Sequence, residues 1–569
     1  MSKFPELKEI KLIFGLFSPL EKIVFSFAGI ILTISLIALI WILNNRFSVE
    51  KPIVGGTLKE GAVGAPNLIN PILASSDLDQ SLAALIYSGL MRSDGKGGLK
   101  FDLAKDYNIS ENGLEYVFYL KEDLKWHNGK PLTNEDVVFT VNSLKNPELK
   151  SSLKPNWEGV EAEAIGINAV KFILNRPYQP FIENATLGIL PKRIWEKIPI
   201  SQWRLANLNL KPIGAGPYKI EKVAKDDSGI ILAYYLERNK KYQPESPRLK
   251  NLIFKIYPSE SELLKAFSNK EIESFGGVSP FNINKTAIKK NEIKTIALPR
   301  IFTLFFNQNK ARIFIEKEVR LALETALDKE RIVNEVLSGY GKAANGPFLD
   351  GFFDLSDGIK PEKRIEKAKD ILAKDGFKLN EKTGILEKKM GKKESIALNF
   401  SISTCECEDL IKAAEILKEV WSLLGAKVEI KIFTAGNLSQ NVIRTRNYET
   451  LLFGEFIGRE PDLFPFWHSS QRFDPGLNIA LYANAKADDL LEKIREERDS
   501  EKRKQYLLEF EKEIKNDIPA VFLYSPDYIY VLPEKIKNFD AEKIAIPAER
   551  FSNIEKWYAE TQKILKIFN

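Results

Sequence analysis

Residues 113–139 read GLEYVFYLKEDLKWHNGKPLTNEDVVF, and more of the fold can be inferred from this stretch than from any other. It opens with a run of aliphatic and aromatic residues, Leu114 to Leu120, which is typical of a strand. A turn follows at residues 126–129, and then a marked helix start, with Thr133 as N-cap and Asp136 as its acidic partner. The stretch therefore predicts a strand, a turn and a helix that packs against a core.

The same stretch resembles the signature region of bacterial extracellular solute-binding protein family 5. Further matches follow in the family's order: GAGPYKI at 214–220, ERNKKY at 237–242, VRLALETALD at 319–328 and Gly346-Pro347. The resemblance extends from about Gly55 to the C-terminus. It implies an α/β class II periplasmic-binding-protein-like fold, with two lobes and an extra domain in lobe one.

The resemblance also implies that the domains are discontinuous in sequence. Lobe one is expected to combine residues 52–87, 212–298 and 518–569. The extra domain is expected at 88–211 and lobe two at 299–517.

Outward from the signature, strand-like and helix-like segments alternate without a fixed repeat, as in one compact α/β body. Two amphipathic helices are predicted over Glu316–Leu337, and they meet at Asp328, the N-cap of the second. The basic segment Lys556–Lys566 is expected to be a solvated helix face. Four further strands are predicted at Ile230–Leu236, Leu252–Tyr257, Val428–Phe433 and Thr450–Phe456.

The N-terminal region predicts a membrane anchor. Residues 23–43 carry no charge, and at about 1.5 Å per residue they span roughly 31 Å, the thickness of a hydrocarbon core. A cleaved signal is the alternative, but no small-x-small cleavage motif follows. Lysines are more frequent in 1–22 than just after the helix, so we expect a single-pass plasma-membrane protein with 1–22 cytoplasmic. A stem at 44–51 then leads to an extracellular or periplasmic body.

The family resemblance places a solute-binding cleft between the lobes. Family members that bind peptides commonly carry an aspartate for the peptide's amino terminus where Gly458 or Arg459 stands here, with Asp462 three residues beyond. Arg459 would favour an anionic group. The full set of implied ligand-binding residues is Ala74, Ser75, Ser76, Arg300, Phe302, Gly454, Glu455, Phe456, Ile457, Gly458, Arg459 and Asp462.

Composition excludes several other functions. The 83 basic and 77 acidic residues balance to +6, which gives no basic field for nucleic acid. The two histidines, His127 and His468, lie in separate segments without a hydrolase or P-loop motif, so we expect no catalytic residues and no cofactor. Cys405 and Cys407 form either a tight disulfide or two reduced thiols, and two ligands are too few for a metal site.

The family resemblance implies the extracellular receptor of an ABC importer, binding di- or oligopeptides by hinge closure. The expected partners are the peptide, or another small solute, and separate permease and ATPase subunits, with residues 23–43 in the membrane. One alternative is the same fold binding a non-peptide solute, such as an anion, a sugar or a metal complex, as a transport receptor or a sensor. A second alternative is an extracytoplasmic hydrolase with an unfamiliar site.

Overall fold

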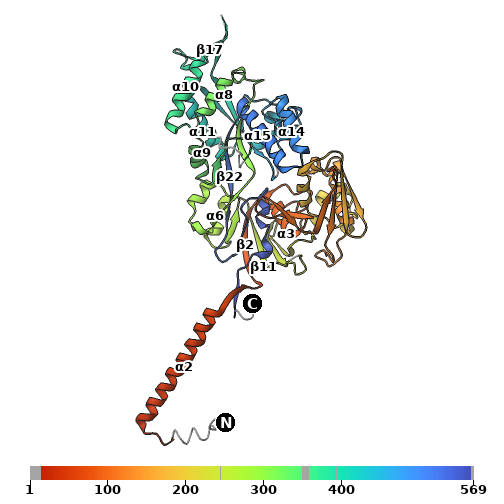
Figure 1. Cartoon of the computed structure of the whole chain (residues 1–569), viewed down its shortest axis with the longest axis vertical. Coiled ribbons are helices and arrows are strands. Elements are labelled where there is room, and N and C mark those ends of the chain that lie inside the picture. Colours follow the sequence, from red (N-terminus) through yellow and green to blue (C-terminus); the bar gives the residue numbers. More distant parts are fainter. Residues whose placement is uncertain (1–14, 244, 349–357, 392–393, 460, 566–569) are drawn as a thin grey trace.

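The N-terminal helix stands clear of the rest of the protein in this computed structural model, which describes residues 15–243, 245–348, 358–391, 394–459 and 461–565 (Figure 1). Helix α2 spans Pro19–Phe47, and none of its apolar window over Pro19–Ile42 is buried. It is long and apolar enough to cross a bilayer, so the predicted N-terminal apolar helix is confirmed.

A two-stranded ribbon connects this helix to the body. Strand β1 (Ser48–Pro52) begins directly after α2 and pairs antiparallel with the C-terminal strand β23 (Thr561–Leu565). The helix predicted for Lys556–Lys566 is therefore wrong: Lys556 ends a short 3₁₀ helix, the chain is not helical at 557–560, and residues 561–565 are a strand whose backbone pairs with the stem. Lys566 lies outside the described residues. Ile53 N–H continues the pairing by donating to the Glu560 carbonyl at 3.1 Å.

Lobe one is built on a sheet in which β11 lies between a parallel neighbour, β2, and an antiparallel one, β10. Alternate residues of β11, including Leu252 and Phe254, are buried, as expected for a strand inside a sheet. The strands are β2 (Gly55–Val63), β9 (Tyr218–Lys225), β10 (Ile231–Arg238), β11 (Leu249–Tyr257), β12 (Ser274–Gly276) and β13 (Ile293–Ala297). The helices are α3 (Asp77–Ile86), α6 (Glu260–Ser268) and α7 (Pro280–Lys285).

The extra domain holds the signature stretch. Its antiparallel sheet has the order β5-β6-β8-β7, and α4 (Asn134–Leu144) begins after Thr133 as predicted, with the Thr133 N–H donating to Asp136 Oδ2 at 2.8 Å. The domain lies beside lobe one, drawn in orange to tan in Figure 1. The strands are β5 (Ala104–Ile109), β6 (Glu115–Leu120), β7 (Val160–Ile165) and β8 (Ala169–Leu174), and a nearby ribbon joins β3 (Met91–Ser93) to β4 (Leu99–Phe101).

Lobe two contains a second part of the large sheet, in the order β20-β19-β21-β14-β22. The two helices predicted over Glu316–Leu337 are present, and Asp328 is the N-cap of the second. The strands are β14 (Arg300–Phe306), β19 (Asn399–Cys405), β20 (Lys427–Phe433), β21 (Thr450–Phe456) and β22 (Ala520–Val531). The helices are α8 (Lys317–Thr325), α9 (Lys329–Leu337), α10 (Arg364–Lys374), α11 (Glu408–Ser422), α14 (Ala485–Glu496) and α15 (Ser500–Asp517). Cys405 and Cys407 form a disulfide.

Two segments connect the lobes. The first lies between β13 and β14, and the second lies within β22, which pairs with β14 through Tyr524 and with β13 from Asp527 onward. The hydrophobic core changes at the same place, because Tyr524 packs in the lobe-two core and Tyr528 in the lobe-one core. The domain borders remain a prediction, and this packing supports a border near Pro526 in place of 517/518.

Candidate functional site

Arg459 follows β21 in lobe two and bonds across to lobe one. Its Nη2 donates to both carboxylate oxygens of Glu549, at 2.7 and 2.6 Å, and its Nη1 lies 3.5 Å from Glu183 Oε2 in the extra domain. The Arg459 side chain is only 3% exposed. Burial by itself would lower its pKa, but the carboxylates of Glu549, Glu183 and Asp94 raise it. A charged contact therefore joins the two lobes.

A second set of contacts joins lobe two to the extra domain. Arg495 Nε and Nη2 donate to the two oxygens of Asp462 at 2.8 and 2.6 Å, and the Tyr178 hydroxyl donates to Asp462 Oδ2 at 3.0 Å. Arg498 Nη1 donates to the carbonyls of Ser110 and Glu111 at 3.2 and 2.5 Å. The lobes are therefore held together by direct protein contacts.

The predicted residues of β21 lie on both faces of the sheet. Glu455 and Ile457 are buried toward the interior, and burial raises the pKa of the Glu455 carboxyl well above its usual value. Phe456 is 38% exposed and pairs in register with exposed Arg300 of β14. Of the residues predicted on these two strands, Phe456 and Arg300 are therefore accessible to a solute.

Gly454 has a packing role. A Cβ placed on it would lie 2.7 Å from Cε1 of Phe302, which is shorter than any real contact. Phe302 in turn stacks on Tyr524 of β22, with ring centroids 5.2 Å apart. Gly458, in the turn that carries Arg459, has a φ of +77°, which favours glycine.

The predicted lobe-one residues lie at the start of α3. Ser76 is the N-cap of this helix, since its hydroxyl accepts a hydrogen bond from the Asp79 N–H at 3.1 Å. Ser75 is exposed, and Ala74 lies on the wall of a cavity. Contact of these three residues with a solute stays a prediction.

This cavity, of about 310 Å³, lies in lobe one and the extra domain. Its wall includes Glu549, so the cavity lies next to the contact with Arg459. Thr186 and Gln80 add polar groups to a wall that is otherwise mostly apolar. A mainly apolar cavity with a few polar groups is typical of a small-molecule site.

Deeper in the wall, charged groups of the cavity are already paired. Arg92 donates to both oxygens of Glu555, at 2.9 and 2.8 Å, and the Tyr242 hydroxyl donates to Asp102 at 2.8 Å. Burial raises the pKa of Asp102. None of these residues, nor Glu549, was predicted as part of a site: Tyr242 lies in the ERNKKY match but was read only as a family signature, and the others lie in no motif and come from distant parts of the chain.

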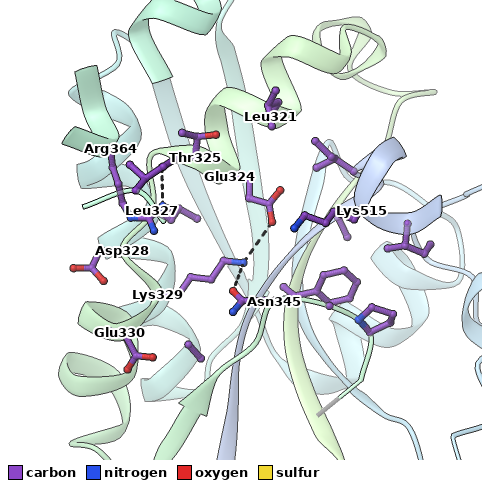
Figure 2. Close-up of a pocket in the computed structure, with 18 of the residues that line it drawn as sticks. Leu321, Glu324, Thr325, Leu327, Asp328, Lys329, Glu330, Asn345, Arg364 and Lys515 are labelled. Atoms are coloured by element: carbon purple, nitrogen blue, oxygen red, sulfur yellow. Dashed lines mark hydrogen bonds and ion pairs between the residues drawn. The ribbon is translucent and has the colours of Figure 1, made fainter. Parts of the chain in front are cut away.

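A larger cavity, of about 440 Å³, lies within lobe two (Figure 2). Most of its labelled residues come from α8, α9, α10 and α15, and the others come from the turn between α8 and α9 and from the loop at Asn345. Lys329 bonds to Glu324 and Asn345 across it, at 3.4 and 3.2 Å. No residue of lobe one lines it among the described residues. It has no direct connection to the contact between the lobes.

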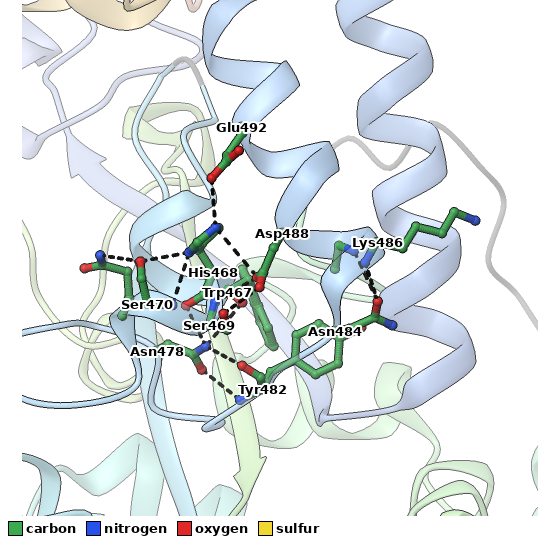
Figure 3. A network of polar contacts seen from close by, with 12 residues as sticks. Trp467, His468, Ser469, Ser470, Asn478, Tyr482, Asn484, Lys486, Asp488 and Glu492 are labelled. Atoms are coloured by element: carbon green, nitrogen blue, oxygen red, sulfur yellow. Dashed lines mark hydrogen bonds and ion pairs between the residues drawn. The ribbon is translucent and has the colours of Figure 1, made fainter. Parts of the chain in front are cut away.

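The two histidines have structural contacts. The His127 ring meets the Gly216 carbonyl at 3.0 Å and accepts from the Gly214 N–H at 3.3 Å, which fixes the signature turn. His468 Nδ1 accepts from the Ser470 N–H at 3.1 Å, as the N-cap of a short helix, and its ring stacks on Phe464 (Figure 3). Both histidines therefore hold turns in place.

Comparisons with known proteins agree with this architecture. The family model described as "Bacterial extracellular solute-binding proteins, family 5 Middle" matches residues 98–476. The oligopeptide-binding protein AppA of Bacillus subtilis is 31% identical over 527 residues, covering 90% of this chain and 94% of that protein. The dipeptide-binding protein of Escherichia coli is 22% identical and covers 88% of this chain and 94% of that protein.

Two solved structures share the fold. AppA of Bacillus subtilis in complex with a nonapeptide gives a TM-score of 0.67 at 29% identity, covering 89% of this chain and 99% of that chain. NikZ of Campylobacter jejuni in complex with Ni(L-His) gives a TM-score of 0.69 at 28% identity, covering 88% and 99%. The two-lobed α/β periplasmic-binding fold predicted from the sequence is thereby confirmed.

Proposed function

We propose that this chain, which belongs to family 5 of the bacterial extracellular solute-binding proteins and is thus a substrate-binding protein of an ABC importer, binds peptides between its two lobes. The observation that carries the proposal is the cavity in lobe one, whose Glu549 bonds to Arg459 of lobe two. A solute there would lie next to the contact between the lobes, and any contact that it makes with lobe two only when the lobes are together would favour closure.

Hinge motion is supported by the two segments that join the lobes. Both are short, and the second lies at Pro526 inside a strand shared by the two parts of the sheet. Small changes of backbone dihedrals at such places can swing whole lobes. The charged contacts between the lobes would then form on closure and separate on opening.

A peptide is the preferred solute because two similar proteins, AppA and the dipeptide-binding protein, bind peptides by name. Exposed Arg300, Phe456 and Ser75, with Ala74, are the proposed contacts. A metal complex is the second candidate, since NikZ was solved with Ni(L-His) at similar identity. Permease and ATPase partners follow as part of the proposal.

We also propose that α2 anchors the receptor in the plasma membrane, with residues 1–22 cytoplasmic and the body outside. The helix passes directly into β1, and β1 pairs with β23, so the body would be held close to the bilayer. Alkaline extraction of membranes tests this. Retention of the full-length chain in the pellet is expected, whereas a soluble chain beginning near residue 44 would mean a cleaved signal.

The test of the solute is mass spectrometry of small molecules released by denaturing the full chain purified in detergent. Peptides are expected, and their lengths would define the size class. A single nickel complex or another non-peptide solute would overturn the peptide assignment and leave the receptor role intact. Turnover of an added peptide pool by the same preparation would support the hydrolase alternative instead.

A further inference from the structure

Glu549 is placed to change partners. It lies on the cavity wall, and both of its carboxylate oxygens accept hydrogen bonds from Arg459 Nη2. One oxygen also accepts from the Ala545 N–H at 2.8 Å, which holds the carboxylate in position independently of Arg459. Its side chain is 16% exposed, so it remains within reach of a solute.

Glu549 is not the only acidic group that stabilises the charge of Arg459. Glu183 lies 3.5 Å from its Nη1, and Asp94 also acts on it electrostatically. The Arg459 side chain is 3% exposed, and leaving such a charge without a partner would be costly. With Glu183 beside it, Arg459 can release Glu549 and still be compensated.

The charges at this point favour a cation. Three carboxylates, of Glu549, Glu183 and Asp94, act on one guanidinium, so an added positive group is attracted and an added negative group is repelled. We therefore place no anionic solute group on Arg459, because its guanidinium is already surrounded by acidic side chains.

We propose that Glu549 is a specificity-determining residue that binds the cationic group of the solute, while Arg459 passes from Glu549 to Glu183. The inference rests on the proposed peptide-binding function, under which the cationic group is the peptide's amino terminus. Glu549 of lobe one would then bind that terminus, with the carboxylate coming from the C-terminal segment of the chain.

The test uses the full chain in detergent and two libraries of di- to nonapeptides that lack Lys and Arg, one with free and one with acetylated amino termini. Calorimetry should show that acetylation weakens binding to the wild type roughly 10- to 100-fold, as expected when a buried charge pair is lost. In Glu549→Gln, acetylation should weaken binding by less than about threefold, since the amino-terminal charge that acetylation removes no longer has its carboxylate partner.

Two further variants make the result specific. Glu549→Asp keeps the charge and should keep the penalty for acetylation, which covers the case that the glutamine variant does not fold. Arg498→Gln removes a different charge between the same lobes, so it should weaken binding of both libraries equally and keep the wild-type penalty for acetylation. An equal acetylation penalty in the wild type and Glu549→Gln would overturn the inference alone. Absence of binding by both libraries would overturn the peptide assignment as well.

Discussion

Glu60 of β2 shows how single residues determine the interior of lobe one. It is 1% exposed, and its carboxylate accepts hydrogen bonds from Arg550 at 2.9 Å, Tyr530 at 2.8 Å and Ser274 at 2.6 Å. Arg550 is itself 4% exposed. A buried charge with this many partners is stable only while the partners remain.

We therefore expect Arg550→Met to destabilise the protein by about 3–5 kcal/mol, because Glu60 would be left buried without its cation. Urea unfolding at pH 7 measures the loss. The double variant Glu60→Gln/Arg550→Met should recover much of it. A single variant that unfolds at the wild-type urea concentration would show that the pair contributes nothing.

His127 gives a pH-dependent prediction. Burial lowers its pKa to about 4, and a proton on Nδ1 would also face the Gly214 N–H. In the unfolded chain the His127 ring binds a proton once the pH falls below about 6.5, whereas in the folded chain it does so only near pH 4. The stability that the neutral ring contributes to the folded state is therefore lost as the pH falls from about 6.5 to 4. The stability gap between wild type and His127→Gln should narrow over that range in urea titrations at each pH. A constant gap would contradict it.

Single-residue roles could be predicted from the sequence where the interacting residues are close together in the chain. The caps at Thr133 and Asp328 were predicted because their partners lie three residues away. Ser76 has the same signal, a serine three residues before an aspartate, yet it was predicted only as a solute contact. Glu549 could not be predicted, because Arg459, ninety positions away in the chain, meets it only when the lobes fold together.

At the scale of elements, the predicted strands and helices occur close to the expected positions. Runs of aliphatic and aromatic residues and the spacing of apolar residues were sufficient to locate these elements, as for β21 over Thr450–Phe456. Strand β23 was missed because an isolated basic segment carries no signal for a distant partner such as β1. Pairing between chain ends is a tertiary contact that the local pattern does not contain.

This ribbon gives an element-scale prediction. Truncation after Ala559 removes β23 and leaves β1 unpaired, so limited proteolysis should cut within Ser48–Pro52 much faster than in the full chain. The melting temperature of the body should change little, because β23 is the only strand that pairs with β1 among the described residues. Truncation after Leu565, which keeps β23, is the matched control. Equal cleavage of both truncated chains would contradict a protective ribbon.

At the scale of the whole molecule, the family resemblance predicted two lobes and the extra domain, while the contacts between lobes came only from the structure. Arg459 and Asp462 were expected to face a solute, and each instead bonds to another part of the protein. The alternation along a strand tells which residues share a face, but it does not tell which lobe will meet that face.

The most direct test of a receptor that closes on peptide is a distance measurement between the lobes. Spin labels at Ile167→Cys in the extra domain and Phe473→Cys in lobe two occupy side chains that are 86% and 72% exposed, and Cys405 and Cys407 are joined in a disulfide that does not take a thiol label. Electron–electron double resonance should show a broad distribution of label-to-label distances without solute and a single shorter distance with saturating peptide. An identical distribution with and without bound peptide would contradict closure on the peptide.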